Sequence, residues 1–529
     1  MLEKLKIQLK HFPIWMGLVV LSLFVVLELI AINKPHSVAD NWLQRVDTLV
    51  YDWRFQGFMP KREETTKIVI IDVDERSLKQ EGRWPWSREK LAKLVEALQR
   101  QQVKLIGFDV VFSEEERNAV QQVLAHSGLS DQAKQELQPL IPVLDGDKKF
   151  AQAITQKTVL GFFLHGAGGI NSGVLPTPLL TVEPRDLDKI TINFMPDYTG
   201  NLAVFANAAL GEGFITTLPD VDGVMRRSPL VLRYENGLYS ALSLELARLY
   251  LNQPSIQLQT VKSGGQLRLE SINLGNHKIY TDESGMALIP YKGKGKSYTY
   301  ISATDILNNP NNMPVLKDAI VLVGTSALGL TDLRTTPLQT AYPGVEIHAN
   351  LLDAIIQSVG DQNHMYYRPD WEPGITFLIL LLSGLAFVFI LPMLEPAYML
   401  AVAGAWLTLL VIVNLVSWKV SHLDFPLAIL VLSTFSIAIL NIGYGFLRTN
   451  NQKREMKMLF GQYVPPAHVE HMLENHHLAG LEGESRHMTV LFSDIRNFTT
   501  ISEGLKATKL KQMLNEFFTP ITGIIFQHN

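Results

Sequence analysis

The sequence predicts a multi-domain membrane protein, in which an α/β domain lies between one transmembrane helix and a group of three. Four long apolar runs predict the helices, because about 20 apolar residues cross the hydrocarbon core of a bilayer. Between the first and second runs, buried strand patterns alternate with a helical pattern, which is typical of a parallel sheet. The chain has 529 residues, a length that favours more than one domain.

Composition excludes several classes of function. The chain contains 0 cysteines, which rules out disulfides, thiolate zinc sites and a cysteine nucleophile. Its formal net charge is -4, and it lacks the excess of basic residues that nucleic-acid-binding proteins usually show. We therefore expect no nucleic-acid partner.

The apolar runs predict transmembrane helices at 13–32, 374–391, 397–416 and 425–446. The first run is longer than the apolar part of a typical signal peptide, and no small-residue cleavage site follows it directly. We therefore interpret it as a retained anchor. Glu28 is a polar exception near its outer end, where we expect it to be tolerated.

Basic flanks predict the orientation of the chain. Lysines lie in the segment 1–12 before the first run, and Arg448, Lys453, Arg454 and Lys457 follow the last run. Both flanks are therefore expected in the cytoplasm, which agrees with an even number of spans. The segment 35–372 is then expected outside the cytoplasm, and 447–484 forms a cytoplasmic linker.

The segment 35–372 carries the α/β pattern. A strand is expected at 67–74 and another at 103–112, with a helix at 87–101 whose leucines and valine share one face. Strand, helix and strand at this spacing predict a parallel βαβ unit. Further central strands are expected at 159–164 and 319–324, and a closing helix at 344–356.

Three acids follow the predicted strands, namely Asp72, Asp74 and Asp109. Acids at strand ends could form a metal or phosphoryl-acceptor pocket, but no third partner is identifiable. We favour structural roles, in which they cap helices or hold loops. The pair Trp84 and Trp86 could line a ligand site, although tryptophans before a helix more often pack into a core.

Several separated motifs in this region resemble one family. They are YDWRF at 51–55, VIIDVDERSL, GRWPWSR, IGFDVVFSE, LPDVDGVMRRSPL at 218–230, VLVGTSALGLTDLRTTPL at 321–338 and PGVEIHANLLDAI at 343–355. In this order they resemble the type-two CHASE domain, a bacterial extracytoplasmic sensor, over roughly residues 41–357. The resemblance implies sensing of an unknown extracytoplasmic signal and a multi-pass protein of the bacterial inner membrane. It implies no catalytic residues.

The segment 488–503 reads MTVLFSDIRNFTTISE. It predicts a short buried strand at 488–492, Asp494 at the end of that strand, and a helix that begins after Asn497. A carboxylate beside the amide groups of a helix start suits a magnesium–polyphosphate complex. The histidines in this region, including adjacent His476 and His477, are interpreted as surface or linker residues.

The same string, with FGQYVPPAHVEHML at 460–473 before it, resembles the opening of the class III nucleotide cyclase domain, which has an α+β, ferredoxin-like fold. The resemblance implies that Asp494 ligates a metal through its side chain and Ile495 through its backbone carbonyl. It places Asn497, Phe498 and Thr499 at the nucleotide phosphates. Glycine is usual at the position of Asn497, but Asn tolerates left-handed geometry.

For a complete domain, the resemblance implies adenylate cyclase activity on ATP, two Mg²⁺ or Mn²⁺ ions for each active site, and a homodimer. The segment 485–529 holds only the first part of such a domain, and the second metal-binding aspartate and later catalytic residues of the family are not in it. We therefore expect that the 529-residue chain does not cyclise ATP. The alternative is a transmembrane sensor or regulatory fragment without enzymatic activity.

Overall fold

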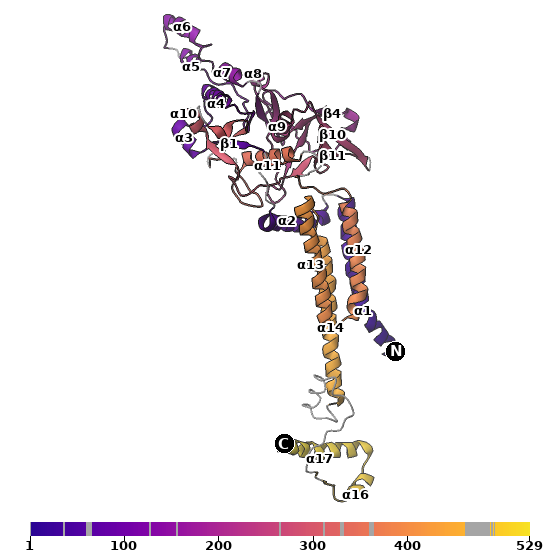
Figure 1. Cartoon of the computed structure of the whole chain (residues 1–529). Coiled ribbons are helices and arrows are strands. Elements are labelled where there is room, and N and C mark those ends of the chain that lie inside the picture. The colour runs from indigo at the N-terminus through magenta and orange to yellow at the C-terminus, as the bar shows by residue number, and fades with distance from the viewer. Residues whose placement is uncertain are drawn as a thin grey trace. The chain divides into compact units, whose positions relative to one another are not determined.

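The computed structural model describes most of the chain and forms two compact units, 1–449 and 450–529, which are considered separately. The described residues are 2–34, 37–59, 66–125, 128–154, 157–263, 266–309, 313–327, 333–358, 364–460, 487, 490 and 492–528. Figure 1 shows the helices and strands as a cartoon, coloured from the N-terminus to the C-terminus.

Four long apolar helices lie where the sequence predicted membrane spans. They are α1 (Leu2–Asn33), α12 (Glu372–Ile390), α13 (Pro396–Ser421) and α14 (Ala428–Phe460). Within the described residues, these four are long and apolar enough to cross a membrane, over Phe12–Asn33, Glu372–Met393, Pro396–Ser421 and Ala428–Asn451. Helix α1 packs on α12, where Gly384 meets Leu21 and Gly17 meets Val388. Small residues allow such close approach between membrane helices.

Helix α14 differs from its prediction at both ends. It begins at Ala428 and not at residue 425, because Pro426 disfavours helical geometry at the residue before it. It then continues without interruption to Phe460, whereas the predicted span ended at residue 446. The stretch 447–460 contains neither proline nor glycine, so nothing in it interrupts the helix.

Helix α2 (Val38–Phe58) follows the first span and was not predicted from the sequence. The side chain of Ser37 caps it by accepting a hydrogen bond from the Asp40 backbone N–H at 3.2 Å. In Figure 1 it lies between the α/β domain and the adjacent ends of the membrane helices.

The central sheet of the α/β domain is mainly parallel, as predicted. Its order is β14-β1-β15-β2-β3, with parallel β6 and antiparallel β5 both on β3. The bounds are β1 (Ile68–Val73), β2 (Leu105–Phe108), β3 (Thr158–His165), β5 (Asp197–Thr199), β6 (Gly211–Phe214), β14 (Thr299–Ser302) and β15 (Ile320–Thr325). Strands β1 and β2 are parallel but not neighbours, because β15 inserts between them. The order of the strands along the sequence does not show this insertion.

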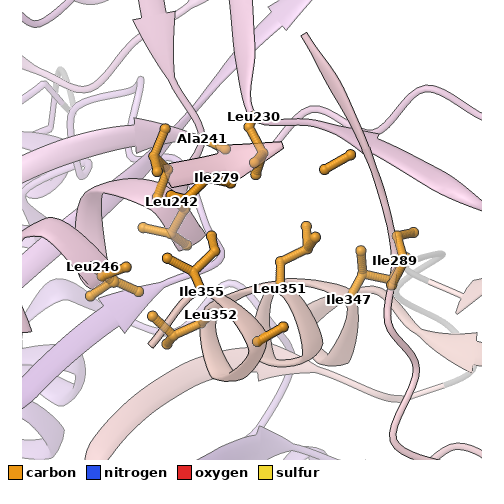
Figure 2. Close-up of a cluster of buried hydrophobic side chains, with 14 of the residues drawn as sticks. Leu230, Ala241, Leu242, Leu246, Ile279, Ile289, Ile347, Leu351, Leu352 and Ile355 are labelled. Atoms are coloured by element: carbon orange, nitrogen blue, oxygen red, sulfur yellow. The ribbon is translucent and has the colours of Figure 1, made fainter. Parts of the chain in front are cut away.

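Helices cover both faces of the sheet. Alternate residues of β1 point to opposite faces, so that Ile70 joins one buried cluster and Ile71 the other. One face packs against α4 (Arg88–Arg100) and α7 (Gly146–Ala153). The other face packs against α9 (Leu242–Tyr250) and α11 (Gly344–Gln357), whose leucines and isoleucines meet in Figure 2. The domain is therefore a three-layer α/β/α arrangement.

Shorter elements complete the two units. In the α/β domain they are α3 (Glu75–Glu81), α5 (Ala119–Leu124), α6 (Asp131–Leu137), α8 (Ala203–Ala206), α10 (Ala303–Asn308), β4 (Leu180–Thr181), β7 (Arg227–Pro229), β8 (Val231–Tyr234), β9 (Gly237–Ser240), β10 (Ile256–Ser263), β11 (Gln266–Leu274), β12 (His277–Tyr280), β13 (Met286–Leu288), β16 (Leu333–Arg334) and β17 (Tyr342–Pro343). The second unit contains α16 (Phe498–Glu503) and α17 (Ala507–Gln527).

Candidate functional site

The residues predicted to bind a metal and nucleotide lie in a turn before α16. Asp494 is exposed, and its Oδ1 accepts a hydrogen bond from the Ile495 backbone N–H at 2.8 Å. The Ile495 carbonyl accepts one from the Phe498 N–H at 3.1 Å. That amide is therefore already engaged, while the carbonyl keeps a second lone pair.

Asn497 adopts the left-handed conformation, with φ 61° and ψ 26°, directly before α16. Its backbone carbonyl accepts a hydrogen bond from the Ile501 N–H at 3.2 Å. The tolerance expected of Asn at this position is thus observed, because Asn enters this region more readily than most residues.

The turn brings together only some of the predicted residues. Asp494, Ile495 and Phe498 line a hollow of about 610 Å³, whose other wall is formed by apolar side chains of α17. Asn497 and Thr499 are not among its lining residues. An apolar wall does not suit a polyphosphate, so the described residues do not by themselves form a nucleotide pocket.

The oxygen donors of this turn suit Mg²⁺, which prefers carboxylate and carbonyl oxygens. Nowhere among the described residues, however, do three or more His, Cys, Asp or Glu side chains gather to hold a metal. Among the described residues, the turn therefore supplies isolated oxygen ligands for a metal ion and not a complete metal site.

The buried strand expected at 488–492 is not observed in the part that is described. Val490 and Phe492 are exposed and belong to no strand, while residues 488, 489 and 491 lie outside the described residues. His468, His471, His476 and His477 also lie outside them, and His487 is exposed.

Asp72 and Asp74 have the structural roles that we expected. Asp74 caps α3 by accepting a hydrogen bond from the Ser77 N–H at 2.8 Å, and it also accepts one from the Ser302 hydroxyl at 2.8 Å. Asp72 accepts hydrogen bonds from the N–H and the hydroxyl of Ser326, at 3.0 and 2.6 Å. These contacts fix the loops after β1 and β15.

Asp109 is different, because it follows β2 and lies on a cavity of about 310 Å³. Its Oδ1 lies 3.9 Å from Nε2 of His348 on α11. Burial raises the pKa of Asp109 to about 7, and the nearby charge of Arg334 opposes that rise. A capping role does not account for this arrangement.

A buried charge cluster joins α2 to the membrane helices. Arg54 of α2 forms an ion pair with Asp424 and donates a hydrogen bond to Asn414 Oδ1 at 3.0 Å. Arg368 donates to the other oxygen of Asp424 at 2.8 Å. The Arg54 guanidinium also lies 4.4 Å from the centre of the Trp418 ring. Burial disfavours the charge on Asp424, but the two arginines hold its pKa below the usual range.

The same helix contacts the α/β domain. Both carboxylate oxygens of Asp52 accept hydrogen bonds from Arg226, each at 2.7 Å. Arg226 also pairs with Asp220 and Asp222. The motifs at 51–55 and 218–230, which are far apart in the sequence, therefore meet at this contact.

Sequence reasoning missed α2 and these two clusters. The YDWRF motif lies in this helix, but the sequence of the motif alone does not show that Arg54 and Asp52 contact different partners. Residues two positions apart on a helix point to different sides of it, and a helical interpretation of 38–58 would have separated Asp52 from Arg54.

The four candidate spans indicate a membrane protein, and the α/β domain lies between the first of these helices and the later three. The CHASE2 domain family matches residues 20–387 of the chain. Because this is more than half of its length, the chain belongs to the CHASE2 domain family, and it carries a CHASE2 sensor domain.

One curated relative shows similarity over a short segment. Adenylate cyclase 1 of Rhizobium meliloti (strain 1021) is 33% identical over 79 residues, which cover 15% of this chain and 12% of the relative. The matched segment is therefore far shorter than that relative. No solved structure matches the chain.

Proposed function

We propose that this protein is a membrane sensor whose CHASE2 domain controls the synthesis of cyclic AMP from ATP. Three observations support the proposal. The chain belongs to the CHASE2 family, a short segment is 33% identical to a protein named adenylate cyclase 1, and the string at 488–503 resembles a cyclase opening. The last observation carries the catalytic part of the proposal.

In this proposal, the Asp494 carboxylate and the Ile495 carbonyl hold a metal ion. The left-handed turn at Asn497 orients the chain so that Phe498 and Thr499 approach the nucleotide phosphates. Bound Mg²⁺ or Mn²⁺ ions would supply activation of the ribose 3′-hydroxyl and offset charge at the α-phosphate. A homodimer would complete the active site.

Asp494→Asn tests the catalytic role. The assay uses membranes of cells that express the encoding gene together with any open frame that follows codon 529. In these membranes, we expect the substitution to lower cyclic AMP formation at least about 100-fold. The same substitution at exposed Asp131 serves as a matched control and should have no effect. Unchanged synthesis in the Asp494 variant would contradict the assignment.

The alternative function is a sensor without enzymatic output of its own. A stop codon directly after Asn529, with no cyclic AMP formed, would favour it. An open frame with a second aspartate motif would favour the cyclase.

We also propose that the CHASE2 domain lies outside the cytoplasm of a bacterial inner membrane, with both termini inside. Basic residues around the first and last spans support this orientation. The chain has 0 cysteines, so each introduced cysteine is unique. Arg117→Cys should react with an impermeant maleimide in intact spheroplasts, and Arg454→Cys only after lysis. Both positions are exposed, and the reverse pattern would overturn the orientation.

For signal transfer, we propose a route through α2. The buried contacts of Arg54 with Asp424 and of Asp52 with Arg226 support it, because one rigid helix joins the sensor to the membrane helices. Asp47 of α2 also accepts hydrogen bonds from the Leu427 and Ala428 N–H groups at the start of α14, at 2.8 and 2.9 Å.

A further inference from the structure

The cavity beside Asp109 lies at the carboxyl edge of the parallel sheet. Asp109 directly follows β2, Thr325 ends β15 and Thr217 lies three residues after β6. In open α/β sheets, ligands bind in the crevice outside the carboxyl ends of the strands. The edge cavity, as we call it, therefore has the position of a ligand site.

Four motifs that are separated in the sequence meet at the edge cavity. Trp84 comes from GRWPWSR, Asp109 from IGFDVVFSE, Arg334 from the stretch 321–338 and His348 from the stretch 343–355. Trp86 packs in the core, whereas Trp84 is half-buried and reaches the cavity. The structural roles described above for Asp72 and Asp74 do not explain this convergence.

The walls of the edge cavity combine charge with apolar surface. Trp84, Phe163 and Ile215 offer aromatic and aliphatic contact, while Arg334 and His348 offer nitrogen donors. The volume of about 310 Å³ lies at the lower end of the range for small-molecule sites, about 300–1,000 Å³. The planar guanidinium of an arginine matches the two oxygens of a carboxylate.

We propose that the edge cavity binds a small organic carboxylate, whose hydrocarbon part lies against Trp84 and Phe163 and whose carboxylate pairs with Arg334. This inference deepens the proposed sensing function, because it names the chemical class of the signal. Inside the cavity, the positive charge of Arg334 would act on both the ligand carboxylate and Asp109.

Proton binding follows from this arrangement. The pKa of Asp109 is about 7, so near neutral pH this side chain carries a proton in part of the molecules. A protonated Asp109 does not repel a bound carboxylate, and its O–H can donate a hydrogen bond to it. Arg334 and His348, the other charged or titratable residues on the cavity, favour the anion when they are positive. Affinity for the anion should therefore rise as the pH falls from 8 to 6.

The test uses the purified full chain in detergent, with benzoate and phenylacetate as probes and benzyl alcohol as a neutral analogue. Calorimetry should show saturable binding of the carboxylates, at least about tenfold tighter than the alcohol, since a charge-assisted hydrogen bond is stronger than a neutral one. Arg334→Gln should weaken carboxylate binding at least about tenfold. Arg185→Gln, at an exposed arginine that does not line the cavity, should leave it unchanged.

Asp109→Asn provides a variant that should gain affinity, so misfolding cannot imitate it. It should bind benzoate more tightly than the original chain at pH 8 and show a smaller change between pH 6 and 8. Equal binding of benzyl alcohol, no effect of Arg334→Gln, or no saturable carboxylate binding up to millimolar concentration would each overturn the inference. No nucleotide is present, so this result is independent of cyclase activity.

Discussion

The acids of the α/β domain and the acid of the second unit differ in how the fold surrounds them. Asp72 and Asp74 each accept hydrogen bonds from two or more groups of other segments, and the side chain of Asp109 is buried beside α11. Asp494 is exposed, and among the described residues its side chain accepts a hydrogen bond from the N–H of the next residue. The comparison shows that a motif can specify a local turn, whereas an enclosed site needs contacts from distant segments.

The largest expected effect concerns the buried cluster of α2. Asp424→Asn would leave Arg54 and Arg368 without the charge that they share. Removal of one partner of a buried ion pair costs about 3–5 kcal/mol. We expect a loss of this size in the unfolding free energy of the purified chain.

The control for this variant is Asp305→Asn, at the more exposed ion pair with Arg76. Such pairs contribute about 0–1 kcal/mol. Similar losses for both variants, measured by thermal unfolding in the same detergent, would show that burial does not distinguish the two pairs.

A second expectation concerns pH. The folded-state pKa of Asp109 is raised from 3.8 to about 7, so the folded state binds this proton more tightly than the unfolded state does. This contribution to stability is complete below the unfolded pKa and is lost as the pH rises through about 7. We expect the unfolding free energy to fall by a few kcal/mol at most between pH 5 and 8.

Asp109→Asn should reduce that slope, and Asp494→Asn, at an exposed carboxylate, should not alter it. Denaturant unfolding at several pH values measures both. An undiminished slope in the Asp109 variant would assign the effect to other buried carboxyl groups.

A third expectation concerns packing within the domain. A Cβ at Gly213 of β6 would lie 2.6 Å from the backbone N and Cα of Leu242 at the start of α9. Backbone atoms cannot yield as a side-chain end can, so Gly213→Ala should cost about 1–3 kcal/mol. Gly57→Ala, where nothing lies within 4 Å, should be neutral or slightly stabilising because Ala favours helix. Equal thermal midpoints for the two variants would contradict this.

The smallest expected effect belongs to the second unit. A β-branched residue is strained in the left-handed region, so Asn497→Val should destabilise the turn by about 1–2 kcal/mol. Amide exchange of peptides covering residues 493–503 should become faster in this variant. Asn497→Gly should exchange as slowly as the original chain, and faster exchange there would indicate that the Asn side chain itself holds the turn.

Much of the fold could be predicted from the sequence, because it depends on local patterns. The apolar runs predicted the four spans, and the strand and helix patterns placed β1, β2, β3, β15, α4 and α11 within a few residues. The insertion of β15 between β1 and β2 could not be predicted, because strand order depends on contacts between segments more than 200 residues apart.

The candidate sites divide in the same way. The sequence by itself determined the four long apolar helices, the family motifs and the turn residues around Asp494, since hydropathy and turn geometry act over a few neighbouring residues. Only the tertiary structure decided that Arg54 meets Asp424, that Asp52 meets Arg226, and that Asp109 shares a cavity with Arg334 and His348. The physical reason is that burial and charge pairing depend on which distant segments the fold brings together.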